Sequence, residues 1–62
     1  MTRYELKIAL SDRGFDVSDV RMAWWHGRKR VVIVTSDLSK TEQIKQAVRE
    51  IAPEVYTVYV DS

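Results

Sequence analysis

The sequence contains no cysteine, which excludes disulfides and thiolate metal sites. It has one histidine and two glycines, and the two glycines, Gly14 and Gly27, stand too far apart to form a phosphate-binding loop. No serine lies in a nucleophile-elbow pattern, and His26 has no nearby carboxylate in the sequence that would orient it as a general base. The aspartates at 12, 16 and 19 lack the spacing of a calcium loop. We therefore expect no enzyme activity, no metal and no cofactor.

Long hydrophobic runs are also missing. No apolar stretch approaches the roughly 20 residues of a membrane helix, and residues 1–10 lack the apolar core of a secretion signal. Together with the absence of cysteine, this favours a cytoplasmic location without a transmembrane segment.

What is present is typical of one small folded domain, spanning 1–62. Hydrophobic residues make up 45% and charged residues 31% of the 62 residues. The net charge of +1 is too balanced to predict a nucleic-acid binder from overall charge. A core of this size supplies only a few kcal/mol of net stability, so self-association would help such a chain.

Two segments have the pattern of helices. Thr2 and Glu5 match a capping box at the start of a helix over 3–13, and Gly14 follows as its left-handed end. A second capping box, from Ser39 to Glu42, with Asp37 or Ser39 as the cap, predicts another helix. Its core-facing residues would be Ile44, Ala47, Val48 and Ile51, and Pro53 would end it.

Three segments, 20–25, 30–35 and 55–60, have the alternation or the β-branched content of strands. The tight basic turn at His26-Gly27-Arg28-Lys29 makes the first two an antiparallel hairpin. A helix joins the second to the third, so these two should be parallel if adjacent. The predicted fold is α+β: a two-layer α/β sandwich in α-β-β-α-β order, with two helices on one face of a three-stranded mixed sheet.

Strand alternation then assigns faces. We expect Val20, Met22 and Trp24 to point toward the helices, because adjacent tryptophans must lie on opposite faces of a strand. Arg21 and Trp25 would then point outward. In the third strand the more apolar set, Tyr56, Val58 and Val60, should face the helices, which leaves Thr57 and Tyr59 on the other face. The strand at 30–35 is apolar on both faces, as in strands that are covered on both sides.

These assignments predict a partner-binding surface on the open sheet face and the basic turn. Its residues are Arg21, Trp25, His26, Arg28, Lys29, Arg30 and Tyr59. The basic turn could bind phosphates or an acidic protein surface. It could equally be a solvated turn that prevents aggregation at the sheet edge.

Three hypotheses follow from this surface. The first is a protein-interaction module, most simply a homodimer joined through the open face or an edge strand. The second binds nucleic acid or anionic lipid headgroups, with Trp25 and Tyr59 stacking on bases and the arginines holding phosphates. The third is a structural monomer in which the faces of the first strand are reversed.

Several short stretches between Leu6 and about Val58 share a further pattern: Leu6-Lys-Ile-Ala9-Leu10, Phe15-Asp-Val-Ser-Asp19-Val20, Gly27, Ala47, Ile51-Ala52 and Pro53-Glu-Val55. Through these residues the chain resembles a BON domain. The chain departs from the family at Ser36, where a second glycine is usual, and lacks the glycine before the last strand. The resemblance implies a non-enzymatic module that binds membrane lipid or protein partners.

Overall fold

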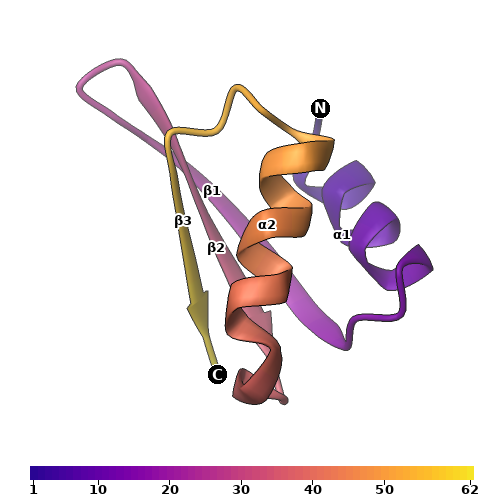
Figure 1. Ribbon diagram of the computed structural model, residues 1–62. Coiled ribbons are helices and arrows are strands. Elements are labelled where there is room, and N and C mark those ends of the chain that lie inside the picture. Colours follow the sequence, from indigo (N-terminus) through magenta and orange to yellow (C-terminus); the bar gives the residue numbers. More distant parts are fainter.

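The computed structural model describes residues 1–62 and has the predicted order of elements (Figure 1). The elements are α1 (Arg3–Asp12), β1 (Val17–Trp25), β2 (Arg28–Thr35), a 3₁₀ turn η1 (Leu38–Lys40), α2 (Thr41–Ile51) and β3 (Thr57–Asp61). The α+β prediction is confirmed. No helix has the length and apolar character needed to cross a membrane.

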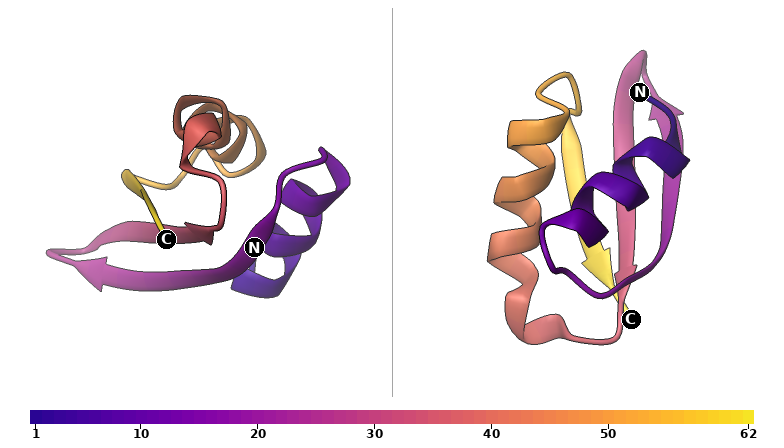
Figure 2. Two further views of the ribbon diagram at one scale, coloured as in Figure 1. Left: turned by 90° about the horizontal axis from the view of Figure 1, so that it is seen from below. Right: turned by 90° about the vertical axis from the view of Figure 1, so that its right-hand side faces the viewer.

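The sheet has the order β1-β2-β3, with β2 in the centre. β1 pairs with β2 antiparallel, and β2 pairs with β3 parallel. Both helices pack on one side of the sheet, and the opposite face carries no element of the chain (Figure 2). The two-layer arrangement with an open face is therefore the observed one.

The core lies between the helices and the sheet. Val31 and Ile33 of β2 are fully buried and belong to the same hydrophobic cluster as Leu6 and Leu10 of α1. α2 contributes the buried residues Ile44, Ala47 and Val48, and β3 contributes Val58. On β3, Val60 also packs against this core, as predicted, whereas Tyr59 is 49% exposed on the open face.

The first helix begins as predicted. The Thr2 hydroxyl accepts a hydrogen bond from the Glu5 amide at 3.2 Å, and the Thr2 amide donates to the Glu5 carboxylate at 3.4 Å. These two bonds satisfy amides that the first turn of a helix leaves unpaired. The chain then leaves α1 through Gly14, whose φ of +90° is the left-handed conformation expected there.

The capping box predicted for the second helix is wrong. Asp37 accepts hydrogen bonds from the amide of Ser39 at 3.1 Å and from its hydroxyl at 2.5 Å. Ser39 is therefore held inside η1, and α2 begins two residues later, after Lys40, with no side-chain cap. Asp37 does cap a helical turn, but that turn is the 3₁₀ segment.

The placement of Trp24 in the core is also wrong, because its side chain is 70% exposed. It does lie on the helix-facing side with Val20 and Met22, so the alternation is right. The reason is length: the nine residues of β1 extend about 30 Å, while the ten residues of α1 span about 15 Å. The hairpin therefore projects beyond both helices (Figure 1), and Trp24 lies on the projecting part.

Tyr56 differs from its prediction for a related reason. β3 begins only at Thr57, so Tyr56 precedes the strand and is 54% exposed instead of facing the helices. Its amide donates to the carbonyl of Lys29 at 2.9 Å, and this hydrogen bond holds the segment beside the first residues of β2.

Candidate interaction surface

The hairpin ends in a two-residue turn formed by His26 and Gly27, shorter than the predicted turn because Arg28 and Lys29 already pair with β1. His26 and Gly27 both have positive φ, +52° and +74°, which is the signature of a type I′ turn. This turn matches the twist of the strands that it joins, so the projecting hairpin is a regular antiparallel ladder up to its last pair. That pair is Trp25 with Arg28.

The ladder places one tryptophan opposite one cation on each side of the hairpin. Trp25 pairs with Arg28, and Trp24 pairs with Lys29. Directly opposed residues have Cβ atoms roughly 5 Å apart, so the side chains of each pair start from neighbouring points of the ladder. Trp25 and Arg28 lie on the same side of the hairpin as the open face. Trp24 and Lys29 lie on the side of the helices.

The arginines also stack on aromatic rings. The Cζ atom of Arg30 lies 5.3 Å from the ring centroid of Trp25, and that of Arg28 lies 4.3 Å from the ring centroid of Tyr56. Both distances are within the range of cation–π attraction. The Nε atom of Arg30 is buried and has no hydrogen-bond partner.

None of the cations at the end of the hairpin forms an ion pair. The ion pairs of the protein are Arg13–Glu50, Arg21–Asp19 and Lys45–Glu42. Lys29 donates instead to the backbone carbonyl of Met1 at 3.3 Å. The positive charge of Arg28, Lys29 and Arg30 is therefore not neutralised by any carboxylate of the chain.

The open sheet face is apolar in its middle. One row across the three strands is Arg21, Val32 and Tyr59, since Val32 pairs with both neighbours. The next row toward the turn contains Ala23, Arg30 and Thr57. The row on the other side contains Asp19, Val34 and Asp61. The face thus has arginines at its hairpin end and carboxylates at its far end.

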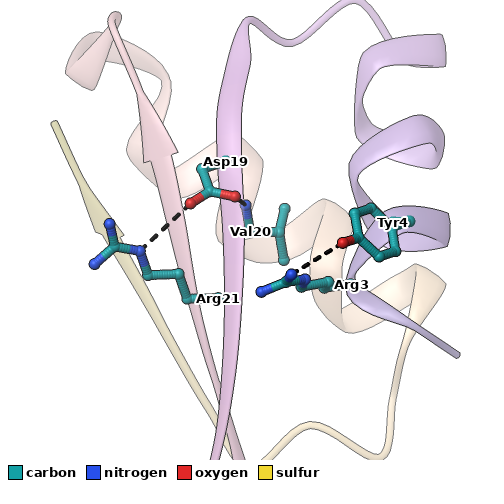
Figure 3. A network of polar contacts seen from close by, with 5 residues as sticks. All are labelled: Arg3, Tyr4, Asp19, Val20 and Arg21. Carbon is teal, nitrogen blue, oxygen red and sulfur yellow. Dashed lines mark hydrogen bonds and ion pairs between the residues drawn. The ribbon is translucent and has the colours of Figure 1, made fainter.

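Asp19 occupies this far end in ionised form. It accepts a hydrogen bond from the Val20 amide at 2.9 Å and one from the Arg21 guanidinium at 3.4 Å (Figure 3). The amide bond first, and then the bond from Arg21, lower the pKa of Asp19 below its ordinary value. Arg3, which donates to the Tyr4 hydroxyl at 2.9 Å, adds a smaller favourable charge from α1 (Figure 3).

The predicted site residues fall into two groups. One group lies near the turn and consists of Trp25, His26, Arg28 and Arg30. There the rings of His26 and Trp25 are nearly perpendicular, with their centroids 4.7 Å apart. Arg21 and Tyr59 lie farther along the open face, on either side of Val32. Lys29 has the orientation of the helix side, next to Trp24.

The structure adds Trp24 and Tyr56 to this surface. Trp24 was assigned to the core because alternation identifies a face but does not tell where the covering helix ends. Tyr56 was assigned to a strand because the run from Val55 to Val60 alternates throughout. The positions of Pro53 and Glu54, directly after the helix, were the available signal that a turn separates α2 from β3.

This surface holds neither a histidine paired with a carboxylate nor a cluster of metal ligands. His26 forms no hydrogen bond and no ion pair with a carboxylate. No cluster of three or more His, Asp or Glu side chains could hold a metal ion. The contacts that the structure does show at the hairpin and open face are aromatic stacking, cation–π contacts and one ion pair, between Arg21 and Asp19.

In comparisons with known proteins, no family model, no curated protein and no solved structure matches the chain. The resemblance to a BON domain therefore stays a prediction.

Proposed function

We propose that the protein is a non-enzymatic interaction module that binds a second copy of itself through the open sheet face. The observation that carries this proposal is the distribution of side chains on that face. Val32 and Val34 occupy the middle of it, with Tyr59 beside them, and no element of the chain covers them. An aliphatic and aromatic centre framed by charges is typical of protein interfaces.

Charge favours a second copy as the occupant. Arg30 stands toward the hairpin end of the face, and Asp61, which forms no ion pair, stands at the other end in the same row as Asp19, which already pairs with Arg21. A surface with opposite charges at its two ends is complementary to itself when one copy is turned end over end. No other partner is needed to explain the two signs.

The same charges select one orientation. A two-fold axis perpendicular to the strands places the arginine end of each face against the aspartate end of the other. A two-fold axis parallel to the strands would place the two basic hairpins side by side, which like charges oppose. The proposed dimer therefore packs two sheets face to face with their β2 strands antiparallel.

Only a weak dimer is expected. Three strands about 4.8 Å apart form a narrow face, smaller than the roughly 800 Å² per partner of a standard interface. Sedimentation velocity at protein concentrations of about 10 μM and about 1 mM should show a shift from monomer to dimer. A monomer at both concentrations would rule the proposal out.

Matched variants test which surface is used. Val32→Lys should give a monomer at the high concentration, because it puts a charge in the apolar centre of the face. Ile8→Lys is the control, since Ile8 is exposed on α1, away from the sheet face. A Val32→Lys protein that still dimerises would indicate pairing through an edge strand and would contradict the proposal.

A charge exchange tests the orientation. Arg30→Glu and Asp61→Arg should each weaken the dimer, and the double variant should restore it, because opposite charges then meet again. Both residues lie on the sheet surface, and circular dichroism would verify that each variant is folded. A double variant weaker than either single one would exclude the antiparallel arrangement.

A further inference from the structure

We infer that the end of the hairpin binds single-stranded nucleic acid, independently of the proposed dimer. The binding residues are Trp24, Trp25, Arg28, Lys29 and Tyr56, which form what we term the tip surface. It combines exposed aromatic rings with cations that have no carboxylate partner.

The segment that carries most of the tip surface is far more positive than the protein as a whole. Segment 20–36 contains Arg21, Arg28, Lys29 and Arg30 and no acidic residue. All nine acidic residues lie outside it, so the rest of the chain is acidic and the net charge is only +1. The overall charge therefore conceals a concentrated positive site, of the kind that phosphates bind.

The aromatic rings make this site more than a basic turn. Trp24 is 70% exposed, Trp25 56% and Tyr56 54%, although large rings are usually covered in a folded protein. Stacking of bases on such rings is tolerant of sequence, because every base has a π face. An aromatic ring next to a cation can thus hold a base and its phosphate together.

The ladder repeats this pairing on both sides of the hairpin. Lys29 lies opposite Trp24, and Arg28 lies opposite Trp25 while stacking on Tyr56. Arg30 already occupies one side of Trp25. Trp24 makes no such cation–π contact within the chain, so its ring is the better base platform.

A single strand fits this surface better than a duplex or a membrane. Duplex bases are stacked on each other and offer no free face to an indole, whereas a single strand does. A loop that enters a membrane would carry its apolar rings at its apex. The rings would then lie at the depth of the lipid headgroups, where interfacial tryptophans are found. Here the apex is His26-Gly27, and the tryptophans stand behind it on opposite faces.

The helix side of the tip surface is separable from the dimer face, whereas Trp25 and Arg28 have the orientation of the open face. Trp24 and Lys29 have the orientation of the helix side, opposite to Val32 and Tyr59. A variant that removes Trp24 should therefore leave self-association unchanged. Conversely, Val32→Lys should leave the tip surface intact.

The test is fluorescence anisotropy with a labelled oligothymidine of about 20 nucleotides, in about 50 mM and about 200 mM salt. We expect saturable binding that weakens at the higher salt. Trp24→Ala should lower the affinity about ten-fold, because one stacking platform is lost. Lys29→Ala should weaken binding, and the slope of log affinity against log salt should become shallower by about one unit, because one phosphate contact is lost.

The controls are an exposed aromatic residue and a cation away from the tip. Tyr4→Ala and Lys45→Ala, on α1 and α2, should bind like the unmodified protein. No binding at the lower salt, or equal losses in all four variants, would overturn the inference. So would equal or tighter binding of a duplex of the same length, or binding of phosphatidylserine vesicles without any binding of the oligonucleotide. Sedimentation of the same samples reports self-association separately.

Discussion

The guanidinium of Arg30 lies over the ring of Trp25, with 5.3 Å between its Cζ atom and the ring centroid. Both side chains belong to the open sheet face, and the Nε atom of Arg30 is buried without a hydrogen-bond partner. The ring of Trp25 is the aromatic group against which this guanidinium stacks.

This contact predicts an energetic coupling between the two residues. In a double-mutant cycle with Arg30→Gln and Trp25→Leu, urea unfolding should give a coupling of about 0.5–1 kcal/mol. The control cycle combines Arg30→Gln with Trp24→Leu, because Trp24 lies on the opposite side of the hairpin. Equal coupling in the two cycles would show that the stacking contributes nothing specific.

Exposure of Trp24 predicts a tolerant position. Trp24→Ala should change the free energy of unfolding by less than about 1 kcal/mol, because the side chain buries little surface. Leu10→Ala, in the fully buried core, should cost about 2–5 kcal/mol. Urea denaturation followed by circular dichroism measures both, and a similar loss for the two variants would place Trp24 in the core after all.

The hairpin turn predicts two changes of opposite sign. Gly27→Ala should destabilise the protein by about 1 kcal/mol, because an alanine at φ +74° is strained even though no atom lies within 4 Å of its Cβ. His26→Asn should be neutral or stabilising, since asparagine is favoured in type I′ turns. Thermal melting measures both effects, and a stabilising Gly27→Ala would contradict the turn type.

The cap at Asp37 predicts a loss of stability in acid. Hydrogen bonds from the Ser39 hydroxyl and amide lower the pKa of Asp37 below its ordinary value of 3.8. Because the folded-state pKa lies below the unfolded-state value, the ionised carboxylate contributes its full stabilisation above the unfolded-state pKa, and this contribution is lost as the pH falls through the folded-state pKa. The free energy of unfolding should therefore decrease between about pH 5 and about pH 2.

Asp37→Asn isolates the share of this residue. The amide can still accept the hydrogen bonds of Ser39 but does not titrate, so the decrease in acid should be smaller than in the unmodified protein. Asp19, whose pKa is lowered by the Val20 amide and Arg21, should account for a further part. Identical pH profiles for Asp37→Asn and the unmodified protein would show that the cap contributes no pH-dependent stability.

Much of the fold could be predicted because its signals are local. Thr2 and Glu5 are three residues apart and form their capping box without help from the rest of the chain. The alternation within each strand puts neighbouring side chains on opposite faces of the sheet, since the side-chain period of a strand does not depend on its partners. Around Val31 and Ile33 both faces are apolar, so only the packing of the helices decided that these two residues are the buried ones. Gly27 likewise indicates that a turn joins the first two strands.

The same alternation was insufficient where an element ends. It placed Trp24 on the helix side correctly, but the exposure of Trp24 depends on how far α1 and α2 reach along the hairpin. The start of α2 was missed because the Asp37 carboxylate binds both the amide and the hydroxyl of Ser39, a competition that spacing alone does not resolve.

The sequence by itself therefore determined the order of the elements, the alternation of side chains within each strand and the presence of a turn around Gly27, but not which face of the central strand is buried. Only the tertiary structure decided that both tryptophans are exposed and that Tyr56 lies beneath Arg28. The physical reason is that periodicity and capping act over a few neighbouring residues. Coverage of a surface depends instead on the relative lengths and packing of elements that are distant in the chain.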